Sequence, residues 1–151
     1  MPGNTLPCLH LKDGTLLGSS TGITRYLGKL FGYYPQDAVA AAKCDYIVDT
    51  YNETIPKFQP FCNAKDDATR QKAAKQLFGT DLPTFMENIA QYIPTKGFIF
   101  GEKLSVADFW IGSFYTNFLN NPHGVCPEVW AQERKKYPAF VAYGERYAKA
   151  N

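Results

Sequence analysis

Apolar and polar residues recur with the period of a helix along most of the chain, after a short strand-like opening. This opening, residues 6–17, has two short apolar runs separated by Lys12-Asp13-Gly14, and an Asp-Gly pair between such runs predicts a two-stranded hairpin. Pro7 cannot donate a hydrogen bond within the first strand, so it must lie at an edge, at a bend or in a cis peptide bond. We therefore expect a small hairpin with a special backbone conformation at Pro7.

The segment after the hairpin predicts an amphipathic helix. Its apolar residues fall at i, i+3, i+4, i+7 and i+8, namely Ile23, Tyr26, Leu27, Leu30 and Phe31. Ser19 or Ser20 supplies the N-cap, and Gly32 followed by Pro35 ends the helix. A two-stranded hairpin needs more strands or a covering helix to be stable, and this helix can cover only one of its faces.

The rest of the chain predicts an all-helical body. Helical stretches are expected from residues 36–38 to Pro56, from residues 66–67 to near Pro94, over 105–119, over 128–135 and over 138–149. Pro56 and Pro60 should break the first stretch, and Pro83 should kink or restart the second. Trp110 and Phe114 read as core residues of the third.

Composition and charge exclude several classes of protein. The chain has 151 residues, 45% hydrophobic and 20% charged, as in a folded globular protein of one ordinary domain or a small domain with a fragment of another. Sixteen basic and fourteen acidic residues are scattered, which gives no footprint for nucleic acid. Apolar runs stay well below the roughly 18 residues of a membrane span. With no leader-like start, we expect a cytoplasmic protein.

The cysteines and histidines give no sign of a metal or dithiol site. Four cysteines are widely spaced without a C-x-x-C pair, which argues for a reduced protein in which they act as small buried hydrophobic residues. Cys8 is set apart from the other three cysteines, because it directly follows Pro7 and its special backbone conformation. His10 and His123 lie far apart, without an acidic or Cys partner at ligand spacing, so we expect no metal.

Leu104-Ser105-Val106-Ala107-Asp108-Phe109 is a capping box with a hydrophobic staple. Ser105 is the N-cap, Asp108 stands three residues later, and Leu104 can pack on Phe109. The box should contribute on the order of 1 kcal/mol to helix formation. We expect Asp108 to contribute as much as Ser105 or less.

Together with Leu6-Pro7 before a strand and Gly18-Ser19-Ser20-x-x-Ile23-x-Arg25-Tyr26-Leu27 after a hairpin, this box resembles the glutathione S-transferase family, most closely its sigma class. The resemblance implies a mostly α fold. Residues 1–34 would form a partial thioredoxin-like, glutathione-binding domain, and residues 35–151 the all-helical C-terminal domain. The family's first strand, first helix and second strand would precede Leu6 and have no counterpart in these residues.

The resemblance also implies a glutathione site. The backbone of Leu6, beside a cis Pro7, would pair with the cysteinyl part, while Ser19 and Ser20 would hold the γ-glutamyl part at a helix N-terminus. Asp49 would reach the glutathione amine of a partner subunit. Each residue also fits a structural role: Pro7 as the end of an edge strand, Ser20 as a helix cap, Asp49 as a solvated acid beside Asp45. No residue of the chain matches a catalytic position.

Two functions follow from the resemblance. The first is a glutathione transferase, with glutathione as co-substrate and no metal, that conjugates glutathione to electrophilic small molecules as a cytoplasmic homodimer. The alternative is a non-catalytic, glutathione-transferase-like structural or interaction subunit of a larger assembly. The absence of a thiol-activating residue from the chain leaves enzymatic activity open.

Overall fold

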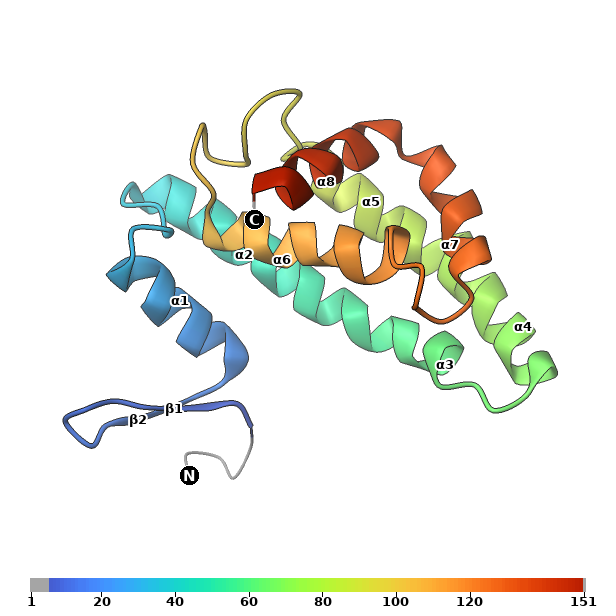
Figure 1. Ribbon diagram of the computed structural model, residues 1–151, viewed down its shortest axis with the longest axis horizontal. Helices are drawn as coiled ribbons and strands as arrows, with labels where there is room; N and C mark the ends of the chain where they lie inside the picture. Colours follow the sequence, from blue (N-terminus) through green and yellow to red (C-terminus); the bar gives the residue numbers. More distant parts are fainter. Residues whose placement is uncertain (1–5, 151) are drawn as a thin grey trace.

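The computed structural model describes residues 6–150, so the first five residues of the predicted first domain and Asn151 lie outside the described residues. The chain opens with an antiparallel hairpin of β1 (Cys8–His10) and β2 (Leu16–Gly18), paired as Cys8↔Gly18, Leu9↔Leu17 and His10↔Leu16. Gly14 has a φ of 88° in the turn, a conformation that glycine adopts without strain. The predicted hairpin is confirmed, and Figure 1 shows it at one end of the molecule.

Helix α1 (Ser20–Leu30) follows the hairpin and begins at the predicted cap. The Ser19 hydroxyl accepts a hydrogen bond from the Gly22 N–H, and Gly32, with a φ of 78°, turns the chain away after the helix. Gly28 lies against α6, because a Cβ atom at this position would come within 2.3 Å of Val106 Cγ2.

The apolar stripe of α1 is mostly exposed. Leu30 and Phe31 are 60% and 66% exposed, and Gly28 is the buried residue of the helix. The helical period was predicted correctly, yet no described element covers the outer part of this stripe.

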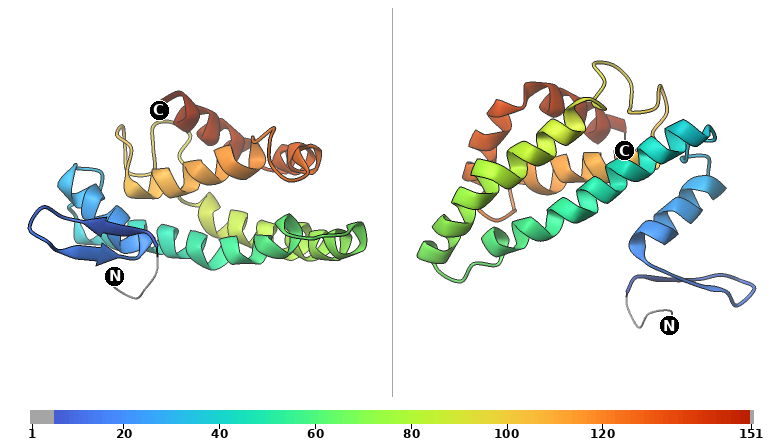
Figure 2. Two further views of the ribbon diagram at one scale, coloured as in Figure 1. Left: turned by 60° about the horizontal axis from the view of Figure 1, so that its bottom comes forward. Right: turned by 180° about the vertical axis from the view of Figure 1, so that it is seen from behind.

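The remaining helices form one body (Figures 1 and 2). They are α2 (Ala38–Thr54), α3 (Gln59–Cys62), α4 (Asp67–Gln76), α5 (Leu82–Ala90), α6 (Val106–Phe114), α7 (Pro127–Glu133) and α8 (Pro138–Ala150). Helix α6 lies between α2 and α8 and contacts both, while α5 packs on α2. The core between them is rich in aromatic rings, with Phe58, Phe114 and Trp130 in mutual contact.

Proline residues divide the long helical stretches without ending them. Pro56 is the second residue of a 3₁₀ segment, Ile55–Phe58, and Pro60 lies in the first turn of α3, so helical structure continues past the predicted break. At Pro83 the predicted restart is confirmed. A π-helical segment, Leu77–Asp81, precedes it, and the Leu82 N–H bonds to the Leu77 carbonyl five residues back.

The predicted capping box at α6 is formed and is part of a larger buried network. The carboxylate of Asp108 is fully buried and accepts four hydrogen bonds. The donors are the Ser105 N–H (2.8 Å), the Ser105 hydroxyl (2.6 Å), the Ile99 N–H (2.9 Å) and the Tyr143 hydroxyl (2.8 Å). One side chain thus ties α6 to α8 and to the preceding loop.

Candidate functional site

The hairpin register brings the predicted glutathione-site residues together. Because Cys8 pairs with Gly18, Pro7 before the first strand lies opposite Ser19 after the second. The Leu6–Pro7 peptide bond is cis, as predicted. Four of the predicted residues, Leu6, Pro7, Ser19 and Ser20, therefore meet where the hairpin joins α1.

The N-terminus of α1 supplies free hydrogen-bond donors at this junction. The first N–H groups of a helix have no partner within it. Here Gly22 bonds to the Ser19 hydroxyl and Ile23 to the Ser19 carbonyl, which leaves the N–H groups of Ser20 and Thr21 outside the helical ladder. Since the positive end of the helix dipole lies here as well, the junction suits a carboxylate.

Backbone strain marks the same position. Ser19 has a φ of 68° and a ψ of 122°, a left-handed conformation that residues other than glycine rarely adopt. Leu6 is 81% exposed, and Ser19 and Ser20 are exposed too. The junction is thus open to solvent.

Asp49, the fifth predicted residue, lies on α2 rather than at the junction, and it is tied to α1 through Arg25. Arg25 donates from Nε to Asp45 Oδ1 (2.6 Å) and from Nη2 to Asp49 Oδ1 (3.1 Å). Tyr34 also donates a hydrogen bond to Asp45. Arg25 belongs to the sequence motif that follows the hairpin, but the motif predicted no contact for its side chain. The sequence did contain a signal for this contact. It has a basic residue on the polar side of α1 and two acidic residues spaced i, i+4 on α2.

The electrostatics of this cluster follow from its packing. Burial alone lowers the pKa of Arg25, but the hydrogen bonds and charges of Asp45 and Asp49 outweigh burial and raise it. Burial, and then the hydrogen bond to Asp45, raise the pKa of Tyr34 to about 12. At neutral pH the cluster therefore holds a charged guanidinium and a neutral phenol beside the two aspartate side chains.

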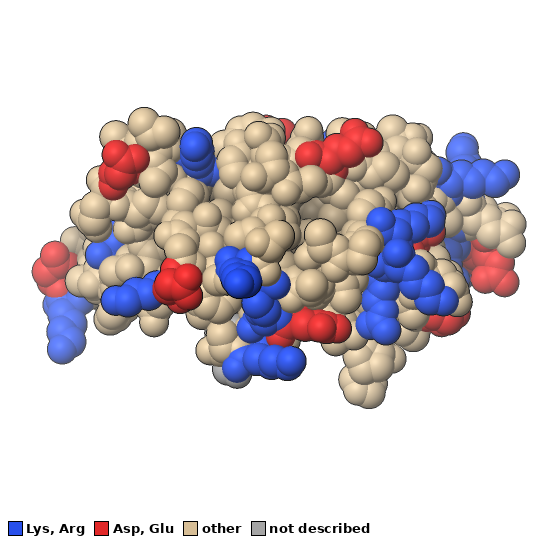
Figure 3. Space-filling view, turned by 90° about the horizontal axis from the view of Figure 1, so that it is seen from above, with Lys and Arg blue, Asp and Glu red and all other residues tan. Residues whose placement is uncertain are grey.

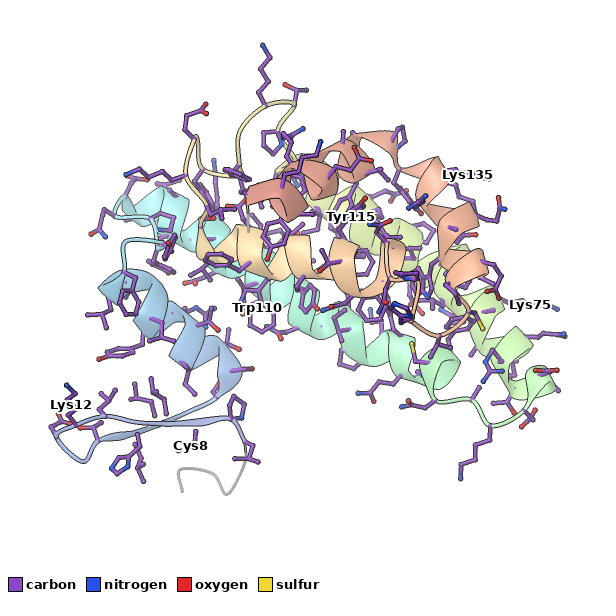
Figure 4. All side chains as sticks on the ribbon, viewed as in Figure 1. Cys8, Lys12, Lys75, Trp110, Tyr115 and Lys135 are labelled. Carbon is purple, nitrogen blue, oxygen red and sulfur yellow. The ribbon has the colours of Figure 1, made fainter. Side chains whose placement is uncertain are left out.

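Two other predictions need correction. Trp110, labelled on α6 in Figure 4, is half-buried and packs against the core rather than within it, with its ring centroid 5.2 Å from that of Tyr51 on α2. Of the four cysteines, Cys44 is fully buried, and burial raises the pKa of its thiol to about 11. Cys8, Cys62 and Cys126 are half-buried instead.

Other kinds of site find little support in the described structure. Within residues 6–150, His, Cys, Asp and Glu side chains nowhere gather in a group of three that could hold a metal ion. None of the helices in that range is both long and apolar enough to cross a membrane. Figure 3 shows acidic and basic side chains interspersed over the face it presents, without a field of one sign.

The chain is similar in sequence to several known proteins. Residues 52–151 match the family model described as "Glutathione S-transferase, C-terminal domain". Glutathione S-transferase 3 of Caenorhabditis elegans is 26% identical over 125 residues, which cover 79% of this chain and 60% of that protein. S-crystallin SL11 of Nototodarus sloanii is 24% identical over 151 residues, which cover 98% of this chain and 70% of that protein.

A solved structure shows the same fold. The prostaglandin synthase D of Nilaparvata lugens matches with a TM-score of 0.72 at 24% identity, covering 98% of this chain and 70% of that one. The chain thus spans roughly 60 to 70% of the length of these proteins.

Proposed function

Since this chain belongs to the glutathione S-transferase family, we propose that it is a sigma-like member that binds glutathione at the junction of β1, β2 and α1. The function proposed for the intact family protein is conjugation of glutathione to electrophilic small molecules. The observation that carries the proposal is the hairpin register, which sets the cis Leu6–Pro7 bond opposite Ser19 and the free N–H groups of α1.

Each site residue has a defined role in this proposal. The backbone of Leu6 pairs with the cysteinyl part of glutathione, and cis Pro7 presents that backbone. The amide and hydroxyl of Ser20, beside Ser19, hold the γ-glutamyl carboxylate. Asp49 receives the glutathione amine of a partner subunit in a cytoplasmic homodimer. No described residue is assigned to thiol activation, which in the family requires a hydroxyl donor that stabilises the thiolate.

The same proposal divides the chain into a partial thioredoxin-like domain, residues 1–34, and an all-helical domain, residues 35–151. The match of residues 52–151 to a C-terminal domain model supports this division. So does the position of Gly32, whose φ of 78° turns the chain between α1 and α2.

The test is a glutathione titration followed by NMR. We expect saturable binding weaker than micromolar, with shifts at the junction, and no detectable conjugation of 1-chloro-2,4-dinitrobenzene by this chain. Ser20→Ala should weaken binding about tenfold, because it removes a hydrogen bond to a charged group. Thr116→Ala, which removes a hydroxyl from the segment after α6, is the control and should not change binding. Shifts elsewhere, or none, would overturn the proposal.

The alternative is a non-catalytic structural or interaction subunit. A relative named as a crystallin rather than as an enzyme aligns with 98% of this chain, and this favours the alternative. It predicts no glutathione binding that depends on Ser20, together with a stable assembly in solution. Because the first function also involves a homodimer, the dependence of glutathione binding on Ser20 in the NMR titration separates the two functions.

A further inference from the structure

We infer that Arg25 is a positioning residue, which holds the carboxylate of Asp49 in place to receive the amine of glutathione. This inference rests on the proposed function, in which Asp49 reaches the glutathione of a partner subunit. It assigns a role to a side chain that lies outside the junction and that would not itself contact the ligand.

The geometry of the contact is that of a fork. Asp45 and Asp49 are four residues apart on α2, so both carboxylates lie on one face of the helix. The guanidinium of Arg25 reaches both, at 2.6 Å through Nε and at 3.1 Å through Nη2. A rigid planar group with several donors can span two carboxylates in this way, whereas the single ammonium of lysine is a point charge on a flexible stem.

The two carboxylates differ in their hydrogen-bond partners and in how far their side chains are exposed. Asp45 accepts from Arg25 and from Tyr34, and its side chain is 37% exposed. Asp49 accepts from Arg25 through one oxygen, Oδ1, and its side chain is 58% exposed. With one cation shared between two anions, the surplus negative charge is presented to solvent at Asp49. An ammonium group is the ligand that matches an oriented, exposed carboxylate.

In the proposed dimer, Arg25 also connects the glutathione site of its own subunit to that of the partner. It lies five residues after Ser20, about 7.5 Å further along α1 at 1.5 Å per residue. The helix that binds the γ-glutamyl carboxylate at its N-terminus is thus bonded, through Arg25, to the residue that receives an amine. Without the fork, an exposed aspartate samples several rotamers, and ordering it on binding would cost affinity.

The test compares glutathione with deaminoglutathione, in which hydrogen replaces the γ-glutamyl amine, by NMR titration of the full chain. We expect the wild-type protein to prefer glutathione about tenfold, as for one hydrogen bond between charged groups. Arg25→Lys keeps the positive charge but loses the fork, and should reduce this preference to less than about twofold. Its affinity for deaminoglutathione should be unchanged. Arg25→Gln serves if Arg25→Lys fails to fold.

Asp49→Asn should abolish the same preference, and the double variant with Arg25→Lys should show no further loss. The matched control is Arg70→Lys, since Arg70 also pairs with an aspartate, Asp67, and both belong to α4, which lies at the end of the molecule opposite α1 (Figure 1). It should keep the full preference.

The outcomes separate the inference from the proposed function. If Asp49→Asn loses the preference for glutathione over deaminoglutathione but both Arg25 variants keep it, the role of Arg25 is overturned and that of Asp49 stands. A wild-type protein that binds both ligands equally, with dependence on Ser20 intact, overturns the inference and the role of Asp49. Absence of binding to either ligand overturns the proposed function and the inference with it.

Discussion

Asp108 shows how much one buried side chain can do at the residue scale. At position N3 of a capping box it would be worth about 1 kcal/mol. In the structure its carboxylate also accepts from the Ile99 N–H and from the Tyr143 hydroxyl, which is 35 residues away. The expectation that Asp108 contributes no more than Ser105 therefore has to be revised.

We predict that Asp108→Ala destabilises the protein by more than about 3 kcal/mol, because it leaves several buried donors without an acceptor. Ser105→Ala should cost about 0.5–2 kcal/mol. Urea unfolding of the two variants and of the double variant checks this, and the double variant should lose no more than Asp108→Ala alone. Equal losses for the two single variants would show that the contacts to Ile99 and Tyr143 contribute little.

Tyr143 makes stability depend on alkaline pH. Burial, then the negative charge of Asp108 and the hydrogen bond to it, raise the pKa of Tyr143 well above its ordinary value of 10.0. Above pH 10 the unfolded chain therefore loses this proton before the folded one does. The contribution is full below about pH 10 and falls by up to about 1.4 kcal/mol per pH unit above it. Urea midpoints from pH 8 to 11 should fall less steeply in Tyr143→Phe than in the wild-type protein.

At the element scale, α6 and α8 approach each other through two glycine–tyrosine contacts. A Cβ atom at Gly144 in α8 would come within 2.2 Å of the ring of Tyr115, at the end of α6. At Gly112 in α6 it would come within 2.3 Å of the ring of Tyr147 in α8. The bare backbone of each helix thus makes room for a ring from the other, which sets the close packing of the pair.

Gly144→Ala should destabilise the protein by about 1–3 kcal/mol, because the ring of Tyr115 must move to admit the methyl group. Helix propensity alone would favour alanine by about 1 kcal/mol. Gly79→Ala is the control, since nothing lies within 4 Å of a Cβ atom there, and it should be neutral or slightly stabilising. Thermal unfolding of the two variants decides the question. A stabilised Gly144→Ala protein would mean that the helices separate easily.

At the scale of the whole molecule, one end carries an unusual amount of exposed apolar surface. Leu16 of the hairpin and Leu30 and Phe31 of α1 are all exposed. Phe31 also lines a groove of about 270 Å³ between α1 and α6, together with Leu27 and Phe109. The described sheet has two strands, with both outer edges unpaired. We call Leu16, Leu30 and Phe31 the hairpin–α1 surface.

We predict that the purified chain associates or aggregates through the hairpin–α1 surface. Light scattering should give a mass above the 16.9 kDa of one chain. Leu30→Ser combined with Phe31→Ser should shift the protein toward the monomer with little loss of stability, since both side chains are already exposed. Val39→Ser on α2, 63% exposed in the wild-type protein, is the control. A wild-type monomer with a cooperative melt would contradict this prediction.

Local signals in the sequence by themselves determined the hairpin, the helix starts and the capping box. An Asp-Gly turn, a Ser cap or an i, i+3, i+4 pattern acts through neighbouring residues, so each can be recognised without the fold. Only the tertiary structure decided that Arg25 spans Asp45 and Asp49, 20 and 24 residues away, and that Trp110 stays half-buried. Such contacts depend on how helices are oriented against each other. That orientation follows from the packing of many side chains at once rather than from any short pattern.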